Sequence, residues 1–320
     1  MADAPILITG GAGFIGSHLC DALLDKGYAV RILDDLSTGR RDNLQIAHPR
    51  LELIEGDVAD AGLVTRAAAG CSAVVHLAAV ASVQASVEDP VRTHQSNFIG
   101  TLNVCEAMRV HGVCRVLFAS SAAVYGNNGE GESIAEDTPK APLTPYAVDK
   151  LASEQYLDFY RRQHGLEPVV FRFFNIFGPR QDPSSPYSGV ISIFSERATQ
   201  GLPITVFGDG EQTRDFLSVG DLVQVMIQAL EQNAKISDPK VMQQALEAIA
   251  YQGQAGSFEA SDMAKWFPQL LAGMEKNGIT GRDAVTSPRT PSVSASSALR
   301  RSGDRQPHRP KRSAVRLTSV

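Results

Sequence analysis

The segment ILITGGAGFIG, residues 6–16, decides the fold class of this chain. Residues 6–9 form a short apolar run of the kind that is buried in a parallel sheet, and an amphipathic stretch from His18 to Lys26 follows the glycines. Glycines at the spacings G-x-G-x-x-G and G-x-x-G-x-x-G let the backbone turn sharply and approach a pyrophosphate, while the start of the helix supplies amide donors. A glycine triplet alone is often only a tight turn, but between a strand and a helix it predicts a dinucleotide-binding loop.

Beyond this loop, strand-like and helix-like segments alternate. The expected strands are residues 29–33, 51–58, 71–79 and 113–118, and residues 97–109 have the apolar spacing of a helix. Such alternation predicts an α/β fold with a Rossmann-type, doubly wound parallel sheet. Ligands of these sheets bind at the carboxyl ends of the strands, where the glycine loop also lies.

Acidic and small residues follow three of these strands. Asp34 stands roughly twenty residues beyond the glycine loop, where a carboxylate accepts hydrogen bonds from the adenosine ribose and repels a 2′-phosphate, which favours NAD over NADP. Its neighbour Asp35 is better explained as a solvated turn acid. Asp57 is placed to accept a hydrogen bond from the adenine amine, and the small residues Ala78 and Ala79 allow close approach of a cofactor.

Tyr146 and Lys150 are four residues apart, which places them on one face of a helix. A nearby ammonium favours the phenolate and lowers the phenol pKa from about 10 toward neutrality, so the pair predicts an acid/base group. The plainer alternative is an ordinary helix start with an exposed lysine. Ser121 ends the strand that begins near residue 113, and it is either a turn residue or a donor to a substrate hydroxyl. Together with a dinucleotide, the three side chains fit the oxidation of an alcohol.

These features occur within a longer set of motifs that resembles a known family. The chain is similar to the extended short-chain dehydrogenases/reductases, specifically to the NAD-dependent nucleotide-sugar epimerase/dehydratase family. The matching segments lie in order between about residues 5 and 230. They are TGGAGFIGSHLC (9–20), LDDLSTGRRDNL (33–44), EGDVAD (55–60), HLAAVASVQASVEDP (76–90), NFIGTLNV (97–104), FASSAAVYG (118–126), PYAVDK (145–150), RFFNIFGPRQDPSSPYSG (172–189) and GDGEQTRDFLSVGDLV (208–223).

The resemblance implies an enzyme that acts on a nucleotide sugar. Sugar dehydratases of the family carry an Asp-Glu pair after the catalytic serine or threonine, whereas this chain has Ala122 and Ala123. It is therefore most similar to the UDP-glucose and UDP-N-acetylglucosamine 4-epimerases of the family, which act in galactose or polysaccharide metabolism. The implied reaction is transient oxidation at C4 of a UDP-hexose and return of the hydride to the opposite face. The alternatives are another nucleotide-sugar oxidoreductase or dehydratase, or a catalytically impaired NAD-binding protein.

The resemblance also assigns roles to individual residues. Asn97 faces the cofactor or the substrate in this reading, but it equally suits a helix cap. Phe174 and Asn175 line the nicotinamide and the substrate diphosphate, although residues 171–177 also read as a buried strand. The guanidinium of Arg214 suits bidentate contact with a diphosphate. The implied catalytic residues are Ser121, Tyr146 and Lys150; the cofactor-binding residues are Gly10, Gly13, Phe14, Ile15, Gly16, Asp34, Asp57, Val58, Leu77, Ala78, Ala79, Asn97, Tyr146, Lys150 and Phe174; the substrate-binding residues are Ser121, Asn175 and Arg214.

Composition limits the partners. A 320-residue chain with 43% hydrophobic residues and a net charge of −5 suits a globular protein and gives no sign of nucleic-acid or membrane binding. The four cysteines lie in apolar segments without C-x-x-C spacing, as expected of reduced packing residues in a cytoplasmic protein. The histidines form no metal-ligand pattern, and His76 reads as a packed core residue. A homodimer through the helices near Asn97 and Tyr146 follows from the resemblance alone.

The predicted domain division is 1–175 for NAD binding with the Tyr/Lys helix, 176–281 for the nucleotide-sugar lobe, and 282–320 for a tail. Residues 202–210 read as a strand and turn, and Asp221 as the N-cap of a helix that ends at Leu230.

The resemblance fails beyond about residue 231, so the substrate lobe is expected to be atypical or incomplete. The tail carries nine Lys/Arg against two acids and is rich in serine and proline, which predicts a disordered, solvated segment rather than one that binds acidic lipid or nucleic acid. The abrupt change also suits a frameshifted, fused or rearranged C-terminus.

Overall fold

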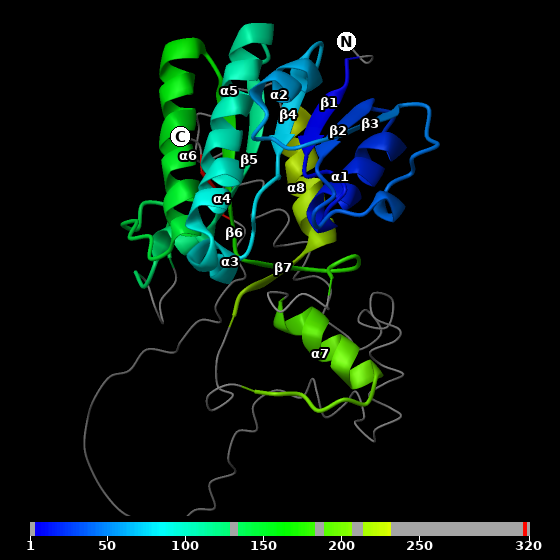
Figure 1. Ribbon diagram of the computed structural model, residues 1–320, viewed down its shortest axis with the longest axis vertical. Helices are drawn as coiled ribbons and strands as arrows, with labels where there is room; N and C mark the ends of the chain where they lie inside the picture. The colour runs from blue at the N-terminus through cyan, green and yellow to red at the C-terminus, as the bar shows by residue number, and fades with distance from the viewer. Residues whose placement is uncertain (1–3, 129–133, 183–188, 207–213, 232–315, 319–320) are drawn as a thin grey trace, which may run out of the picture.

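The computed structural model describes residues 4–128, 134–182, 189–206, 214–231 and 316–318. Its centre is a sheet in the order β3-β2-β1-β4-β5-β6-β9 (Figure 1). The first six of these strands are mutually parallel, and β9 pairs antiparallel with β6. The strands are β1 (Ile6–Thr9), β2 (Val30–Asp34), β3 (Leu51–Glu55), β4 (Ala73–His76), β5 (Arg115–Ser121), β6 (Glu167–Phe173) and β9 (Arg316–Thr318).

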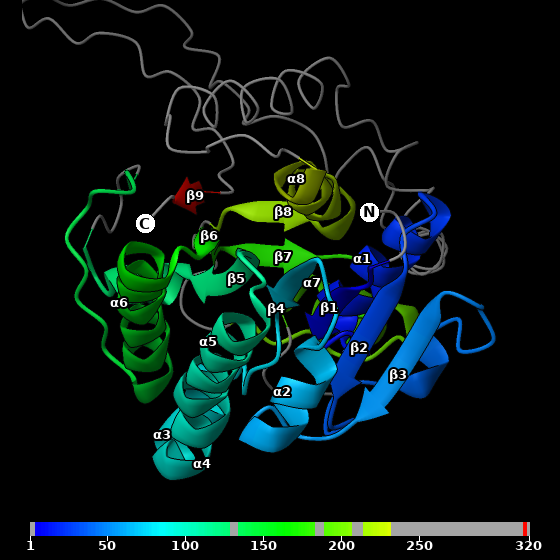
Figure 2. The same ribbon diagram turned by 90° about the horizontal axis from the view of Figure 1, so that it is seen from above.

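Helices cover both faces of this sheet (Figure 2). On one face, α1 and α8 share a hydrophobic core with β1 and β2, while α2, α5 and α6 form the core on the other face. All four residues of β1 are buried, because the strand is covered on both sides. The helices are α1 (Phe14–Asp25), α2 (Ala61–Ala68), α3 (Val83–Glu88), α4 (Pro90–His94), α5 (Gly100–His111), α6 (Pro145–His164), α7 (Val190–Thr199) and α8 (Val219–Glu231), with short turns η1 (Arg41–Asn43), η2 (Gln95–Ile99, a π-helical turn) and η3 (Ala122–Tyr125).

The predicted fold class is confirmed. Strand order runs outward from β1 in both directions, through β2 and β3 on one side and through β4, β5 and β6 on the other. The order therefore reverses between β1 and β4, and ligands of doubly wound sheets bind at that point, beyond the carboxyl ends of the strands.

A second, smaller sheet follows β6. β7 (Asn175–Phe177) and β8 (Phe216–Ser218) pair in parallel over three residues each. α7 has no buried residue among its described side chains, whereas seven residues of α8 are buried, and α8 packs on α1. By packing, α8 thus belongs with the central sheet, although its residues fall inside the predicted 176–281 segment.

Three local predictions differ from the structure. Residues 202–206 form no strand with any strand in the described part of the chain, and residues 207–210 lie outside the described residues. Asp221 is the third residue of α8 rather than its N-cap; Ser218, which accepts a hydrogen bond from the Gly220 amide at 3.2 Å, precedes the helix. Residues 316–318 of the tail form β9, while the rest of 282–320 lies outside the described residues.

All four cysteines are free thiols; three are buried, and Cys114 is exposed. Burial raises the pKa of both Cys20 and Cys105 to about 12, which keeps these thiols protonated. None of the helices in the described part of the chain is both long enough and apolar enough to cross a membrane.

Candidate active site

The glycine loop lies between β1 and α1 and leaves no room for side chains. Gly10 has φ +70°, and a Cβ on it would lie 2.7 Å from the Ala78 amide nitrogen. A Cβ on Gly16 would lie 2.4 Å from the Gly10 carbonyl oxygen. Gly13 precedes α1, and no side chain caps the helix, so the first-turn amides of Phe14 and Ile15 are not covered by a capping group. A cradle of bare backbone at an uncapped helix start fits the pyrophosphate of a dinucleotide.

Asp34 is the last residue of β2 and hydrogen-bonds the backbone of the glycine loop. It is 6% exposed, and its two carboxylate oxygens accept hydrogen bonds from the amides of Ala12 at 2.8 Å and Leu36 at 2.9 Å. Burial raises the pKa of Asp34, and the two amide hydrogen bonds oppose that rise. Asp35 forms a local turn instead, where it accepts from the amide and hydroxyl of Ser37, as expected of a turn acid.

The adenine side of the predicted site contains Asp57 and Val58. Asp57 accepts a hydrogen bond from the Ala59 amide at 2.8 Å, in an exposed turn after β3. Val58 is 5% exposed and packs against Gly100, where a Cβ would lie 2.7 Å from its Cγ2. The bare backbone of Gly100 therefore brings α5 close to this edge of the sheet.

Asn97 holds the segment that follows β4. Its side-chain oxygen accepts from the Val80 amide at 2.8 Å, and its side-chain nitrogen donates to the Val80 carbonyl at 3.1 Å. The alternative of a helix cap is therefore wrong: Asn97 lies within η2, 1% exposed, and clamps the end of the Leu77–Val80 segment. At the other end of this segment the Ala78 amide donates to Thr9 Oγ1 at 3.2 Å.

His76 is the packed residue that its surroundings predicted. It is 2% exposed, and its ring nitrogens contact the hydroxyls of Thr9 at 2.7 Å and Thr101 at 3.0 Å. Burial lowers its pKa to about 3, with a smaller contribution from the charge of Lys150, so the ring is neutral at physiological pH.

Ser121, Tyr146 and Lys150 meet where β5 ends and α6 begins. Thr144 caps α6 by accepting from the Ala147 amide at 3.3 Å, and Pro145 occupies the first turn, so the helix starts immediately before Tyr146. A side-chain hydrogen bond joins Ser121 and Tyr146. Tyr146 and Lys150 are 9% and 3% exposed, which excludes the alternative of an exposed lysine at a helix start.

From the spacing, the charge of Lys150 was expected to lower the pKa of the Tyr146 phenol. The structure gives other causes for the pKa of this phenol. Burial raises the pKa of Tyr146, and the hydrogen bond from Ser121 is what lowers it. The Lys150 ammonium lies 4.9 Å from the centre of the Phe118 ring and 5.8 Å from that of Tyr146. Burial lowers the pKa of Lys150 to about 8, while the carboxylates of Asp149 and Glu154 oppose this shift. Burial thus lets Lys150 lose its proton, and with it the positive charge, at a lower pH than the spacing to Tyr146 alone suggested.

The predicted substrate residues follow β6. Phe174 separates β6 from β7, so residues 171–177 are two strands rather than one. The Asn175 side chain donates to the Asp215 carbonyl at 3.0 Å, and Asn175 lies opposite Phe216 in the β7–β8 register. This pairing brings Asn175 to Asp215, the residue that follows the exposed Arg214 in the chain, although 40 positions separate Asn175 and Asp215.

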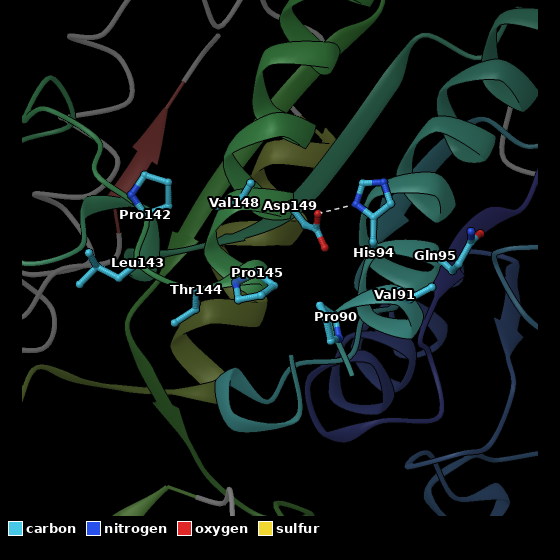
Figure 3. A pocket seen from close by; sticks show the side chains of 10 residues that line it. All are labelled: Pro90, Val91, His94, Gln95, Pro142, Leu143, Thr144, Pro145, Val148 and Asp149. Atoms are coloured by element: carbon cyan, nitrogen blue, oxygen red, sulfur yellow. Dashed lines mark hydrogen bonds and ion pairs between the residues drawn. The ribbon is translucent and has the colours of Figure 1, made fainter. Parts of the chain in front are cut away.

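A cavity of about 600 Å³ lies on another side of α6 (Figure 3). His94 Nδ1 contacts Asp149 Oδ1 at 2.8 Å, while Asp149 Oδ2 is buried and has no hydrogen-bond partner in the described structure. In Figure 3 this second oxygen points toward the space between Pro90 and Pro145. None of the residues predicted for the active site lines the cavity, whose lining is Pro90, Val91, His94, Gln95, Pro142, Leu143, Thr144, Pro145, Val148 and Asp149.

Comparison with known families agrees with this geometry. Residues 6–243 match the model of the NAD-dependent epimerase/dehydratase family. The chain belongs to this family. Membership confirms the resemblance read from the motifs, and with it NAD as the cofactor and a nucleotide-sugar epimerase/dehydratase as the class of enzyme. A second family model, that of a phage-related minor tail protein, matches residues 211–288, across the point where the motif resemblance fails.

Several relatives of the family are similar over most of the chain. A putative UDP-glucose 4-epimerase of Methanocaldococcus jannaschii is 41% identical over 227 residues, 70% of this chain and 73% of the relative. Among solved structures, a UDP-N-acetylglucosamine 4-epimerase of Methanobrevibacter ruminantium in complex with UDP-N-acetylmuramic acid is 40% identical, with a TM-score of 0.70, and 73% of this chain covers 75% of it. A Thermus thermophilus UDP-glucose 4-epimerase complex with NAD is 42% identical, with a TM-score of 0.66, and the match covers 71% and 75% of the two chains.

No sequence motif indicated a second group of charged residues beside this site. Glu154 and Arg172 form a buried ion pair directly behind Ser121 and Lys150. A signal for Glu154 exists in the sequence, since a lysine and a glutamate four residues apart share a helix face. Arg172 carries no local signal, because its partner comes from a different element.

Proposed function

We propose that this chain catalyses NAD-dependent 4-epimerisation of a UDP-hexose. The observation that carries the proposal is the hydrogen bond between Ser121 and Tyr146, one helical turn from Lys150 and at the same carboxyl end of the parallel sheet as the glycine loop. Bound NAD would be held by the loop at Gly10–Gly16, by Asp34 and by the Leu77–Val80 segment. When bound, it supplies a hydride acceptor at C4 and then the donor that returns the hydride.

The protein's own groups manage the proton and the sugar. Tyr146, as the phenolate, takes the proton of the C4 hydroxyl and holds it on its phenol oxygen until the 4-keto sugar is reduced on its other face. The Ser121 hydroxyl, which hydrogen-bonds Tyr146 in the protein without substrate, would turn its single hydrogen to the C4 oxygen when the sugar is bound. Lys150 is assigned to the binding of NAD, since Ser121 rather than Lys150 opposes the rise that burial causes in the pKa of Tyr146. Ala122 and Ala123, which follow Ser121 at the start of η3, offer no acid to expel water, which argues against a dehydratase.

The substrate diphosphate is assigned to the β7–β8 end of the site. Asn175 of β7 and Arg214, two residues before β8, would supply an amide and a guanidinium, and the guanidinium suits a phosphate oxygen pair. We accordingly propose that residues 1–175 and α8 form the NAD-binding domain, and that the segment after β7 binds the nucleotide sugar.

We also propose a homodimer formed through α4, α5 and α6, in a cytoplasmic protein. These helices lie side by side on the outer surface of the molecule (Figures 1 and 2). They expose a set of large apolar side chains that a second copy would cover: Val91 (72%), Val110 (59%), Val148 (49%), Tyr156 (43%) and Phe159 (43%). Sedimentation of the purified chain tests the dimer, and a monomer at all concentrations contradicts it.

The activity is tested by incubating the purified protein and NAD with UDP-glucose or UDP-N-acetylglucosamine and separating the C4 epimers by chromatography. We expect the galacto epimer to form from at least one of the two without net NADH. Accumulation of NADH or of a 4-keto sugar would instead indicate an oxidoreductase or a dehydratase. NAD binding without turnover of either sugar would contradict the proposal and indicate a catalytically impaired protein.

A further inference from the structure

A buried ion pair connects α6 to β6 behind the candidate catalytic residues. Arg172 donates to both carboxylate oxygens of Glu154, from Nε at 2.9 Å and from Nη2 at 2.6 Å. The two side chains are 5% and 4% exposed. Burying two charges is costly unless their geometry and remaining hydrogen bonds are good, so a pair kept at such a place calls for an explanation beyond stability.

Hydrogen bonds connect this ion pair to the elements that carry the candidate catalytic residues. Ser120, which precedes Ser121 at the end of β5, donates its hydroxyl hydrogen to Glu154 Oε1. Arg172 Nη1 donates to the hydroxyl of Tyr125 in η3 at 2.8 Å and to the Glu136 carbonyl at 3.0 Å. One network thus holds β5, η3, α6 and β6 together, along with the segment that leads into α6.

Glu154 also lies one helical turn beyond Lys150. The Lys150 ammonium faces the ring of Phe118, and the carboxylates of Asp149 and Glu154 raise its pKa against the effect of burial. The other titratable groups around it are Tyr146 on the same helix and the neutral His76 of β4. Glu154 is therefore a source of negative charge that favours the charged form of Lys150.

We propose that Glu154 and Arg172 are positioning residues of the reaction proposed above, on which this inference rests. Their pair holds Ser121, Tyr146 and Lys150 in one arrangement and sets the charge around the Lys150 ammonium. Neither residue is assigned contact with the sugar or with NAD.

The two residues have opposite charges, and this makes the proposal testable. Replacing Glu154 by glutamine removes a negative charge near Lys150 and leaves the Arg172 cation unbalanced, so the lysine should lose its proton at lower pH. Replacing Arg172 by methionine leaves the carboxylate unbalanced, and the lysine should keep its proton to higher pH. The double variant E154Q/R172M removes both charges and should return close to the parent.

The experiment measures the alkaline limb of the kcat profile of 4-epimerisation and, independently of turnover, the ionisation of Tyr146 by ultraviolet difference titration against Y146F. We expect the alkaline limb to move by about one pH unit downward in E154Q and upward in R172M, since an opposite charge shifts a neighbouring pKa by this order. In the titration, Tyr146 should ionise at lower pH in E154Q than in R172M, because Lys150 is already neutral where the buried phenol titrates and the unbalanced Arg172 cation then favours the phenolate. The matched control is D158N, which removes a carboxylate one turn farther along α6, where Asp158 pairs with Arg161 and Arg162.

Equal shifts in the two single variants, or no shift in folded protein, would overturn the inference and leave the pair a structural one. If one single variant fails to fold, the other single variant and the double variant are compared with the parent, and an alkaline limb that moves as far in the double variant as in the single variant, or that moves in neither, would overturn the charge role. If the parent protein epimerises no UDP-sugar, the proposed function fails, while the ultraviolet titration still decides whether the pair controls Lys150 and Tyr146.

Discussion

The two halves of the candidate site are built in different ways. The cofactor half lies along the carboxyl ends of six parallel strands, where the backbone register of the sheet places Thr9, Asp34, His76 and Ser121. The substrate half, as far as the structure describes it, rests on a pair of three-residue strands and on α7, which has no buried described side chain. A long buried sheet determines positions through many cooperative contacts, whereas a short pair determines them through few. Changes in the first half should therefore act on the whole protein, and changes in the second should act locally.

The largest expected effect is on chemistry rather than on folding. Y146F removes the acid/base oxygen and should lower kcat for 4-epimerisation by about 10²- to 10⁴-fold, the range that general acid–base catalysis supplies. NAD affinity and thermal stability should change little. The control is Y156F, an exposed tyrosine on the same helix. A Y146F variant with near-parent kcat would remove Tyr146 from the mechanism.

Truncating one apolar side chain in each half compares their packing most directly. Leu222 of α8 is fully buried in the core shared with α1, and L222A should lower the free energy of unfolding by about 2–5 kcal/mol. Ile193 of α7 is only partly buried, and I193A should cost clearly less. Urea denaturation of both variants makes the comparison. Equal losses would show that α7 is as well packed as α8.

The glycine loop offers a graded test. A Cβ on Gly16 would lie 2.4 Å from the Gly10 carbonyl oxygen, whereas on Gly13 its nearest contact would be 3.3 Å from the same atom. G16A should therefore destabilise the protein by about 1–3 kcal/mol, as overpacking does, and weaken NAD binding more than G13A. Thermal unfolding and titration calorimetry with NAD measure the two effects. The reverse order of the two variants would contradict the role given to the loop.

In the substrate half the expected effect is smaller and confined to one ligand. R214K keeps the charge but loses the planar fork of the guanidinium, and it should raise KM for the UDP-sugar by about tenfold, or about 1.4 kcal/mol. NAD affinity and stability should stay at the parent values. R197K, in the last turn of α7, is the control. Weaker NAD binding in R214K would show that the two halves are not independent.

The smallest effect is a pH dependence of stability. The pKa of Lys150 is lowered by burial to about 8, while the unfolded chain has the ordinary lysine value. Between these pKa values the unfolded state binds more protons, so this group makes stability rise with pH above about 8. Below pH 8 both states hold the proton, and the cost of burying the charge is present in full. The difference in unfolding free energy between the parent and K150M should therefore move in favour of the parent between pH 8 and 9.5. A difference independent of pH would contradict the lowered pKa.

Local sequence patterns located the backbone features of the cofactor half. The glycines at 10 and 16 are closely packed, Asp34 ends β2, and Tyr146 and Lys150 share one helix, while the roles given to these residues stay predictions. Each of these signals depends on residues close together in the chain or on the alternation of strands and helices. Asn97 was ambiguous, because its partner Val80 lies in another segment and only the folded chain brings the two together.

The misjudged features share a cause. The strand expected at 202–206 has no neighbouring strand among the residues that the structure describes, and a strand requires hydrogen bonds that the segment itself does not supply. The pKa of Tyr146 was assigned from the spacing to Lys150, whereas it depends on burial and on Ser121, which is 25 positions away. Both errors come from judging a residue without the environment that folding creates around it.

The sequence by itself determined the order of strands and helices, the site of the glycine loop and the pair of residues on one face of α6, because these follow from periodicity and from backbone requirements that are local. Only the tertiary structure decided that Glu154 meets Arg172, that Asn97 clamps Val80, that α8 packs with α1 and that Asn175 lies beside Asp215. The physical reason is that burial, charge and hydrogen bonding act between atoms that are close in space, and closeness in space between distant segments is settled only when the core packs.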